Sequence, residues 1–346
     1  MKILILYSEL AGYTLACLRR LLQDYPVELH LIRWPVNAEA PFNFDFGDQV
    51  KVKDRAHLNQ ADLDREVKDF EPDGIFVSGW MDKGYVQALR QKPHGCPVIC
   101  GLDNQWTGNL RQRVATVLSP WLIKKHFDYI WAAGPRQADY ARRLGFLDSQ
   151  VRTGYYSADV ERFAEHRAGF LPKGKRTLLY VGRIMAHKGI AELIQAFLRL
   201  NHPDWELKLV GKPDGTVDIP IHPKIIHEDF VQPNLLPPLL ASAHAFALPS
   251  QSEPWGVALH EAAACGLPLI ASTACGAADA FIDPGENGWL FQAGDGEDLA
   301  QVLRKLFDLP EAEWKKFGHH SQKLAQQITP KTWATTLYQL IQDHRP

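Results

Sequence analysis

Residues 177–200 read TLLYVGRIMAHKGIAELIQAFLRL, and this stretch decides the fold class. The apolar run Thr177–Val181 has the length and composition of a buried strand. After a short loop that contains glycine, Gly189–Leu200 carries apolar residues at helical spacing. A strand that leads through a short loop into a helix is the building unit of a parallel sheet, so we expect an α/β protein.

The same alternation recurs on both sides of this stretch. Short apolar runs bounded by glycine, proline or aspartate are separated by segments with helical spacing, which is typical of doubly wound sheets. The sequence therefore predicts two Rossmann-like doubly wound units. The expected strands of the first half are Ile3–Tyr7, Val27–Ile32, Ile75–Val77, Pro97–Cys100 and Tyr129–Ala132, and the further strands of the second half are Glu206–Val210, Lys224–Ile226, Ala245–Leu248 and Leu267–Ala271.

Two boundaries divide the chain. The segment Tyr155–Arg176 is rich in charges, glycine and proline and has no consistent apolar period, so we place the domain boundary within it. We expect a first domain at residues 1–160 and a second at residues 161–330. Residues 331–346 begin with apolar side chains at helical spacing, which predicts a closing helix that packs back on the first domain.

Composition and charge exclude several classes of protein. The chain has 346 residues, 46% of them hydrophobic, which is enough for two cores. Lys and Arg (38) nearly balance Asp and Glu (40), so the overall charge does not favour nucleic-acid binding. No apolar run reaches the roughly 18 residues of a membrane span, and the cysteines form no C-x-x-C pair that would hold zinc. We expect a soluble, cytoplasmic protein.

Two cations follow the strand Thr177–Val181. Arg183 and Lys188 lie in the loop between Gly182 and the helix that starts at Gly189, at the sheet edge where doubly wound domains bind ligands. A guanidinium and an ammonium group beside a helix N-terminus form an anion site, because their charges add to the unpaired N–H groups and the helix dipole. A diphosphate fits such a site, and ordinary solvated loop charges are the alternative.

A second motif is ALPSQSEPWGVALHE at residues 247–261. A strand ends there, the following loop carries Glu253, and a helix carries Glu261 in its first two turns. Carboxylates accept hydrogen bonds from vicinal sugar hydroxyls, and free first-turn amides can donate to a phosphate. This stretch can therefore contact a sugar, a phosphate and a ribose together. The amides concerned belong to Gly256, Val257 and Ala258.

These motifs resemble those of the retaining glycosyltransferases of family 4, also described as glycosyl transferases group 1. The resemblance is specific over Leu178–Leu299 and weaker in the first half. It implies the GT-B fold, in which two Rossmann-like domains face each other across a cleft, an acceptor-side domain first and a donor-binding domain second. The matching residues are Gly182-Arg183, Lys188-Gly189, Pro249-Ser250, Glu253, Glu261-Ala262, Cys265-Gly266-Leu-Pro268 and Asp283-Pro-Gly285-Glu-Asn-Gly288.

The resemblance also implies roles for individual residues. The family's residues that match Arg183 and Lys188 bind the donor diphosphate. The residue that matches Glu261 holds the ribose, and the one that matches Glu253 contacts the transferred sugar. We therefore expect Arg183, Lys188 and Glu253 to carry the catalysis, without a metal or a cofactor. The donor-binding set is completed by Gly12, Gly182 and the backbone of Gly256, Val257 and Ala258.

Loops of the first half are the candidates for the acceptor side. One contains Trp80, and the loop after Pro97–Cys100 contains Asp103, Asn104 and Trp106. Some members of family 4 place a histidine where this chain has the second loop. These side chains offer hydrogen-bonding groups beside aromatic faces, although the tryptophans can equally be part of the core.

The implied reaction is transfer of a sugar from a nucleoside-diphosphate sugar to a hydroxyl acceptor, with retention of the anomeric configuration. The acceptor would be a glycan, a glycolipid or a small molecule. Two alternatives stay open, because a fold does not determine a function. A GT-B-like epimerase or phosphorylase would use the same cleft, and a non-catalytic sugar-nucleotide-binding subunit would bind the donor without turnover.

The stretch Arg111–Phe127 combines apolar side chains with Arg111, Arg113, Lys124 and Lys125. A helix of this composition can lie at an anionic membrane surface, which would make the protein peripheral at the inner membrane face. A buried helix with basic ends is the favoured interpretation.

Overall fold

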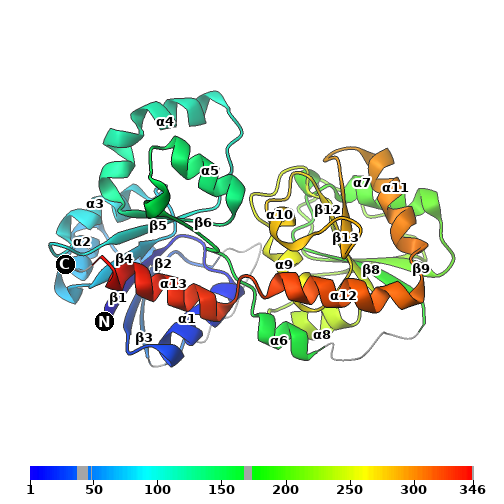
Figure 1. The fold of residues 1–346 in the computed structure, drawn as a ribbon, viewed down its shortest axis with the longest axis horizontal. Helices are drawn as coiled ribbons and strands as arrows, with labels where there is room; N and C mark the ends of the chain where they lie inside the picture. The colour runs from blue at the N-terminus through cyan, green and yellow to red at the C-terminus, as the bar shows by residue number, and fades with distance from the viewer. Residues whose placement is uncertain (37–45, 48, 167–173, 345–346) are drawn as a thin grey trace. The chain divides into compact units, whose positions relative to one another are not determined.

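The computed structural model describes residues 1–36, 46–47, 49–166 and 174–344. The chain forms two compact units, one of Met1–Ser157 with Pro330–Pro346 and the other of Ala158–Thr329. Each unit is built on one parallel sheet with helices on its faces (Figure 1). The prediction of two doubly wound α/β units is therefore confirmed.

The sheet of the first unit has seven strands in the order β3-β2-β1-β4-β5-β6-β7. Ile3 of β1 pairs with Leu29 of β2 on one side and with Gly74 of β4 on the other. All five predicted strands are present, and β3 and β7 are additional. The bounds are β1 Lys2–Tyr7, β2 Glu28–Arg33, β3 Val50–Asp54, β4 Gly74–Val77, β5 Val98–Leu102, β6 Tyr129–Ala132 and β7 Val151–Thr153.

Side chains of β1 alternate between two apolar layers, as successive residues of a strand point to opposite faces. Ile3 and Ile5 join the cluster that contains α1 and α13, whereas Leu4 and Leu6 join the cluster that contains α2, α3 and α5. The helices of this unit are α1 Gly12–Asp24, α2 Gln60–Phe70, α3 Lys83–Ala88, α4 Leu110–Leu122, α5 Pro135–Arg143 and α13 Pro330–Gln342, with short 3₁₀ turns η1 Arg55–His57, η2 Leu89–Gln91, η3 Lys124–His126 and η4 Asp148–Gln150.

The last helix, α13, packs in the first unit as predicted. Trp333 and Leu337 are buried in the same cluster as α1, and the Trp333 indole N–H donates a hydrogen bond of 2.8 Å to the Tyr155 carbonyl. Ile341 lies so close to β4 that a Cβ added at Gly74 would be 2.5 Å from its Cγ1. The C-terminal segment is therefore a packed part of this core.

The sheet of the second unit has six strands in the order β10-β9-β8-β11-β12-β13. All predicted strands are present, and β13 is additional. The strands are β8 Arg176–Val181, β9 Trp205–Val210, β10 Ile225–Glu228, β11 Ala245–Leu248, β12 Leu269–Ser272 and β13 Gly288–Phe291. The helices are α6 Val160–Glu165, α7 Ile190–Leu200, α8 Leu236–Ala241, α9 Val257–Ala264, α10 Ala278–Phe281, α11 Gly296–Phe307 and α12 Glu311–Ala325, with the 3₁₀ turn η5 Ala186–Lys188.

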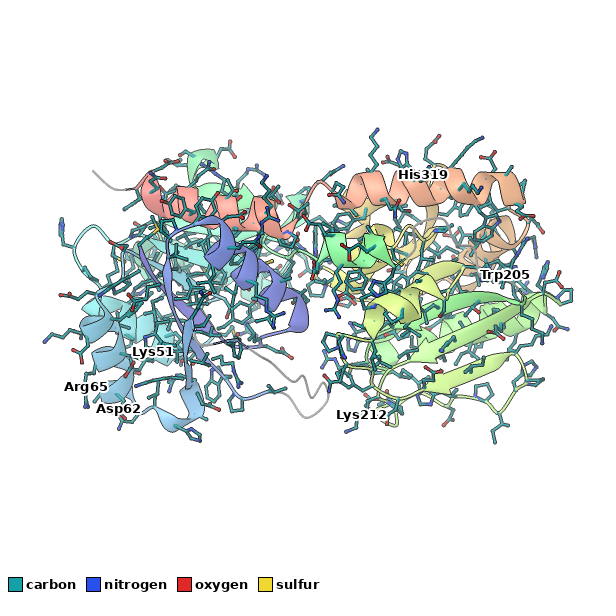
Figure 2. The ribbon with its side chains drawn as sticks, turned by 90° about the horizontal axis from the view of Figure 1, so that it is seen from below. Lys51, Asp62, Arg65, Trp205, Lys212 and His319 are labelled. Carbon is teal, nitrogen blue, oxygen red and sulfur yellow. The ribbon has the colours of Figure 1, made fainter. Side chains whose placement is uncertain are left out.

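Aromatic packing closes one face of this sheet. Trp205 of β9 is fully buried and stacks on Phe307 of α11 at 4.5 Å between ring centroids (Figure 2). The ring of Trp314, in α12, has its centroid 5.8 Å from that of Trp205. On the same helix, His319 is exposed (Figure 2). Helices α11 and α12 are thus held on the sheet by buried aromatic rings.

The favoured interpretation of residues 111–127 as a buried helix was wrong. In α4 only Ser119 is buried, while large apolar side chains such as Val117 and Trp121 are exposed. Helical spacing identifies an apolar face but not the direction in which it points, and here it points away from the protein. Among the described helices, none is both long and apolar enough to cross a membrane.

Truncation of Leu337 tests the contribution of α13. We expect Leu337→Ala to lower the free energy of unfolding of the first unit by about 3 kcal/mol, because it leaves a cavity in a fully buried cluster. Gln339→Ala, on the exposed side of the same helix, is the control. Urea unfolding followed by circular dichroism measures both, and equal midpoints would contradict the packing role.

Candidate functional site

The two sequence motifs of the second unit follow neighbouring strands. β8 pairs with β11 through Leu178↔Ala245 and Leu179↔Phe246, and the strand order reverses between these two strands. Open α/β sheets bind ligands at the carboxyl ends of the strands that flank such a reversal. The loop with Arg183 and Lys188 and the loop with Glu253 both start at this point.

Glycines allow the two loops to touch. Gly189 has φ 68°, and a Cβ at this position would collide with the Pro249 carbonyl. The backbone of Gln251 donates a hydrogen bond of 2.8 Å to the His187 carbonyl. The turn that carries Lys188 is therefore fastened to the loop after β11.

Lys188 and Glu253 meet across this contact. The Lys188 ammonium lies 2.7 Å from Glu253 Oε2, and the two side chains are only 12% and 13% exposed. The Ser250 hydroxyl donates a bond of 3.1 Å to the same oxygen. Charge-assisted hydrogen bonds of this kind fix both groups in direction as well as in place.

Arg183 leaves the sheet from the same loop. Its side chain is exposed, and its carbonyl accepts a bond of 2.7 Å from the Tyr180 hydroxyl. Burial, and after it the negative charge of Glu253, raises the pKa of Tyr180 well above its ordinary value. The phenol therefore stays a hydrogen-bond donor that holds the start of this loop.

Helix α9 begins beside Glu253. Its N-cap is Gly256, with φ 100°, and a Cβ there would lie 3.1 Å from Glu253 Cγ. Because glycine has no side chain to cap the helix, the first-turn amides of Val257 and Ala258 can donate to a ligand. The helix dipole adds positive potential at the same end.

Glu261 lies in the second turn of α9 next to a second carboxylate. Burial, reinforced by the negative charge of Asp159, raises the pKa of Glu261 from 4.5 to about 8. Burial also raises the pKa of Asp159. The site thus contains one glutamate that is paired with a cation, Glu253, and one that tends to keep its proton, Glu261.

The predicted acceptor-side loops belong to the first unit. The loops after β1 and β4 are joined by Ser8 and Ser78, whose hydroxyls lie 2.9 Å apart, and α1 begins at Gly12. Trp80 and Trp106 are partly buried against the core. This agrees with the alternative interpretation, in which the two tryptophans are part of the core.

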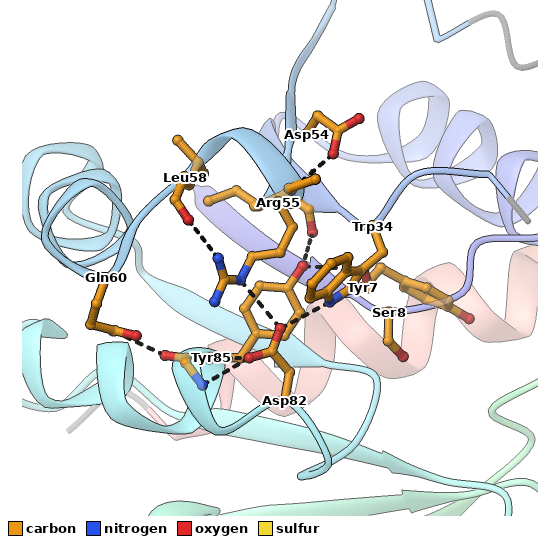
Figure 3. A network of polar contacts seen from close by, with 12 residues as sticks. Tyr7, Ser8, Trp34, Asp54, Arg55, Leu58, Gln60, Asp82 and Tyr85 are labelled. Atoms are coloured by element: carbon orange, nitrogen blue, oxygen red, sulfur yellow. Dashed lines mark hydrogen bonds and ion pairs between the residues drawn. The ribbon is translucent and has the colours of Figure 1, made fainter.

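Asp82 organises the loop that contains Trp80 (Figure 3). Its Oδ1 accepts bonds from the Gly84 and Tyr85 amides at 2.8 and 3.1 Å. Its Oδ2 accepts bonds from the Trp34 indole at 2.9 Å and from Arg55 Nε at 3.2 Å. The carboxylate caps α3 and ties together the loops that follow β2, β3 and β4.

Asp103 and Asn104 follow β5 in different environments. The Asp103 carboxylate accepts a bond of 3.2 Å from the Tyr156 hydroxyl, and its carbonyl accepts one of 3.1 Å from Gln137 Nε2. The pKa of Asp103 is raised, mainly because the carboxylate is buried. Asn104 is exposed, and the Trp106 ring lies 4.9 Å from the Arg143 guanidinium carbon.

Comparison with known families identifies the second unit. Residues 161–323 match the family model described as glycosyl transferases group 1. The second unit is a glycosyl transferases group 1 domain. The protein is therefore a glycosyltransferase, as its motifs predicted.

Curated relatives of this glycosyltransferase bear related names. The chain is 26% identical over 335 residues to a glycogen synthase of Mycobacterium tuberculosis (strain ATCC 25618 / H37Rv), covering 88% of this chain and 78% of the relative. It is 32% identical over 195 residues to a D-inositol 3-phosphate glycosyltransferase of Arthrobacter sp. (strain FB24), covering 51% of this chain and 46% of the relative.

Solved structures share the fold of the whole glycosyltransferase. Anabaena Alr3699/HepE in complex with UDP has a TM-score of 0.76 at 17% identity, covering 99% of this chain and all of that one. Sucrose-phosphate synthase from Thermosynechococcus elongatus has a TM-score of 0.76 at 20% identity, with 99% and 98% covered. These likenesses establish the GT-B fold.

Sequence analysis of the glycosyltransferase missed two residues that act on predicted ones. Asp159 lies beside Glu261, and Tyr156 binds Asp103, although each pair is far apart in the chain. Neither residue belongs to a motif, so no local signal marked them. Both residues lie in the stretch Tyr155–Arg176, which the sequence marked only as a domain boundary.

Gly189→Ala tests whether the two loops must touch. The new Cβ would strike the Pro249 carbonyl, so we expect the variant to unfold at a lower temperature and to misplace Lys188. Gly215→Ala is a matched control, because Gly215 also has a positive φ of 84° but nothing within 4 Å of the added Cβ. Differential scanning calorimetry compares the two, and an equal loss of stability would show that φ strain alone matters.

The raised pKa of Glu261 predicts a dependence of stability on pH. The native carboxyl keeps its proton up to about pH 8, whereas the unfolded chain releases it near 4.5. Stability should therefore fall as pH rises through this window and level off above it. We expect Glu261→Gln to flatten that part of the curve of melting temperature against pH. The exposed Glu286→Gln should keep it, and identical curves would contradict the shift.

Proposed function

We propose that this glycosyltransferase moves a sugar from a nucleoside-diphosphate sugar to a hydroxyl acceptor with retention of configuration. The observation that carries the proposal is the junction of Lys188, Glu253 and the N-terminus of α9 at the strand reversal of the second unit. A cation, a carboxylate and free helix amides together suit a molecule that is half diphosphate and half sugar. HepE, a structural neighbour, has been solved with UDP-glucose, which supports a donor of this class.

The diphosphate would be held by the two cations of the loop after β8 and by the amides at the start of α9. Lys188 is anchored by Glu253, and Arg183 projects from the same loop. The amides of Val257 and Ala258 add donors from the other side. Cleavage of the donor places negative charge on the leaving phosphate, and fixed donors aimed at that charge lower the barrier without having to reorganise.

The two glutamates would hold the two sugars of the donor. Glu253 accepts hydrogen bonds at the loop where the transferred sugar would lie. Glu261, with its raised pKa, can both accept and donate hydrogen bonds to the ribose hydroxyls. Gly182 and Gly256 let the backbone approach the donor, and Gly12, at the start of α1, completes the proposed donor-binding set.

Retention follows if the acceptor attacks from the face that the diphosphate leaves. The bond between the anomeric carbon and the phosphate oxygen breaks as the bond to the acceptor oxygen forms. The acceptor proton passes to the departing phosphate oxygen, so charge and atoms balance. The proposal includes neither a resident metal nor a cofactor.

The acceptor side would lie in the first unit. Asp103, held by Tyr156, and the exposed Asn104 can bind an acceptor hydroxyl, with Trp80 and Trp106 beside them. The acceptor would be a glycan, a glycolipid or a small molecule. We also propose a cytoplasmic location, because all five cysteines are buried thiols that form no disulfide, with peripheral contact at the inner membrane face.

Lys188→Ala tests the proposal. We expect turnover to fall by about 10²–10³-fold, the effect typical of removing one donor to a developing charge. Lys305→Ala, an exposed lysine of α11, should behave like the wild type. The assay is release of nucleoside diphosphate, after a panel of nucleoside-diphosphate sugars that includes UDP-glucose has been screened for a rise in melting temperature.

The outcomes separate the alternatives. Diphosphate release that needs an acceptor, with an unchanged anomeric configuration in the NMR spectrum of the product, supports retaining transfer. Release without an acceptor points to an epimerase or phosphorylase, and binding without release points to a non-catalytic subunit. Wild-type turnover in Lys188→Ala would remove this lysine from the mechanism.

A further inference from the structure

Helix α4 carries its apolar side chains on the outside. A helix of a protein in water normally turns its apolar face inward. In α4 the exposed apolar residues recur at helical spacing along one stripe of the helix, and a neighbouring leucine widens the stripe. The exposed residues and their exposures are Leu110 77%, Val114 49%, Val117 69%, Leu118 39%, Trp121 64% and Leu122 59%.

The inward face of α4 is held by polar contacts. The buried Ser119 hydroxyl donates a bond of 2.7 Å to the Leu144 carbonyl. Gln112 Nε2 donates a bond of 2.8 Å to the Gln105 carbonyl, and its Oε1 accepts bonds of 2.7 and 3.1 Å from the amides of Thr107 and Gly108. The outward stripe therefore contributes little to the folded unit, and Figure 1 shows α4 at its periphery, away from the sheet. An exposed apolar patch without a folding role marks a binding surface.

The charged residues of the chain segment that carries the stripe all have one sign. No aspartate or glutamate occurs between Asp103 and Asp128, although the chain as a whole has a net charge of −2. Arg111 and Arg113 flank the stripe and are exposed, and Lys125 is exposed just beyond the end of the helix. Burial lowers the pKa of His126, and the positive charges of Lys125 and Arg90 lower it further. Arg90 therefore belongs to the same basic region.

A second copy of the chain does not fit this surface. Two copies that met symmetrically through α4 would bring together cations from both ends of the helix, Arg111 and Arg113 at one end and Lys125 at the other, and like charges across an interface repel. An anionic bilayer supplies both complements, acyl chains for the stripe and phosphates for the cations. Amphipathic helices with cations beside an apolar face bind at that boundary.

We infer that α4 docks the protein on an anionic lipid bilayer, with the stripe in the boundary between head groups and acyl chains and with Arg111, Arg113 and Lys125 at the lipid phosphates. This inference specifies the surface for the peripheral contact proposed above. It does not depend on sugar transfer, because docking requires neither donor nor acceptor.

Sedimentation of the full chain with vesicles tests the inference. The wild type should pellet with vesicles of phosphatidylcholine and phosphatidylglycerol, less so at high salt, and should stay in solution with phosphatidylcholine alone. Leu110→Ser and Trp121→Ser should each lower the partition constant by about tenfold. Leu147→Ser is the matched control, because Leu147 is 64% exposed but lies outside α4, and it should bind like the wild type.

Each contrary result overturns the inference. Failure of the wild type to pellet with anionic vesicles removes the bilayer as the occupant. Equal binding of Leu110→Ser and Leu147→Ser shows that α4 is not the surface. Concentration-dependent dimerisation without lipid, abolished by Leu110→Ser in analytical ultracentrifugation, assigns the stripe to a second copy. Circular dichroism checks that the variants keep their fold, and an inactive chain that still docks would count against the proposed reaction only.

Discussion

The contact between Gly189 and Pro249 is the constraint on which the candidate donor site depends. Adjacent strands β8 and β11 bring two loops to one edge of the sheet, but adjacency alone leaves the loops free to diverge. A residue without a side chain, with φ 68°, lets the turn after β8 lie on the Pro249 carbonyl. Lys188 and Glu253 can form their ion pair only because this contact sets the spacing between the loops.

The two glutamates of the site experience opposite electrostatics although they are eight residues apart. Glu253 faces an ammonium group and a hydroxyl at hydrogen-bond distance, and both donate to its carboxylate. Desolvation, and after it the negative charge of Asp159, raises the pKa of Glu261. The start of α9 therefore lies between a glutamate that is paired with a cation, Glu253, and a glutamate with a raised pKa, Glu261, which can donate a hydrogen bond. Such a difference allows a single short segment to recognise chemically different parts of one ligand.

The sequence predicts the inner strands well and the outer ones poorly, for a physical reason. Strands inside a parallel sheet are covered on both faces and appear as continuous apolar runs, such as Ile3–Tyr7. The three strands that were missed, β3, β7 and β13, all lie at the edge of a sheet. β3, with the sequence VKVKD, is buried only at its first residue. Likewise, motifs mark the candidate site residues, whereas Asp159 and Tyr156 are found only through contacts between distant segments.

Helix α4 shows where periodicity stops being informative. The pattern of apolar residues over Leu110–Leu122 is the same whether the stripe faces a core or the outside, so the sequence could not decide the direction. What decides it is the partners of the polar face, since Ser119 and Gln112 find backbone groups of the first unit. Once these polar groups are satisfied inward, the apolar stripe must point outward. The loop with Asp103 and Asn104 leads into this helix, so a surface bound by α4 would also lie near the predicted acceptor-side residues.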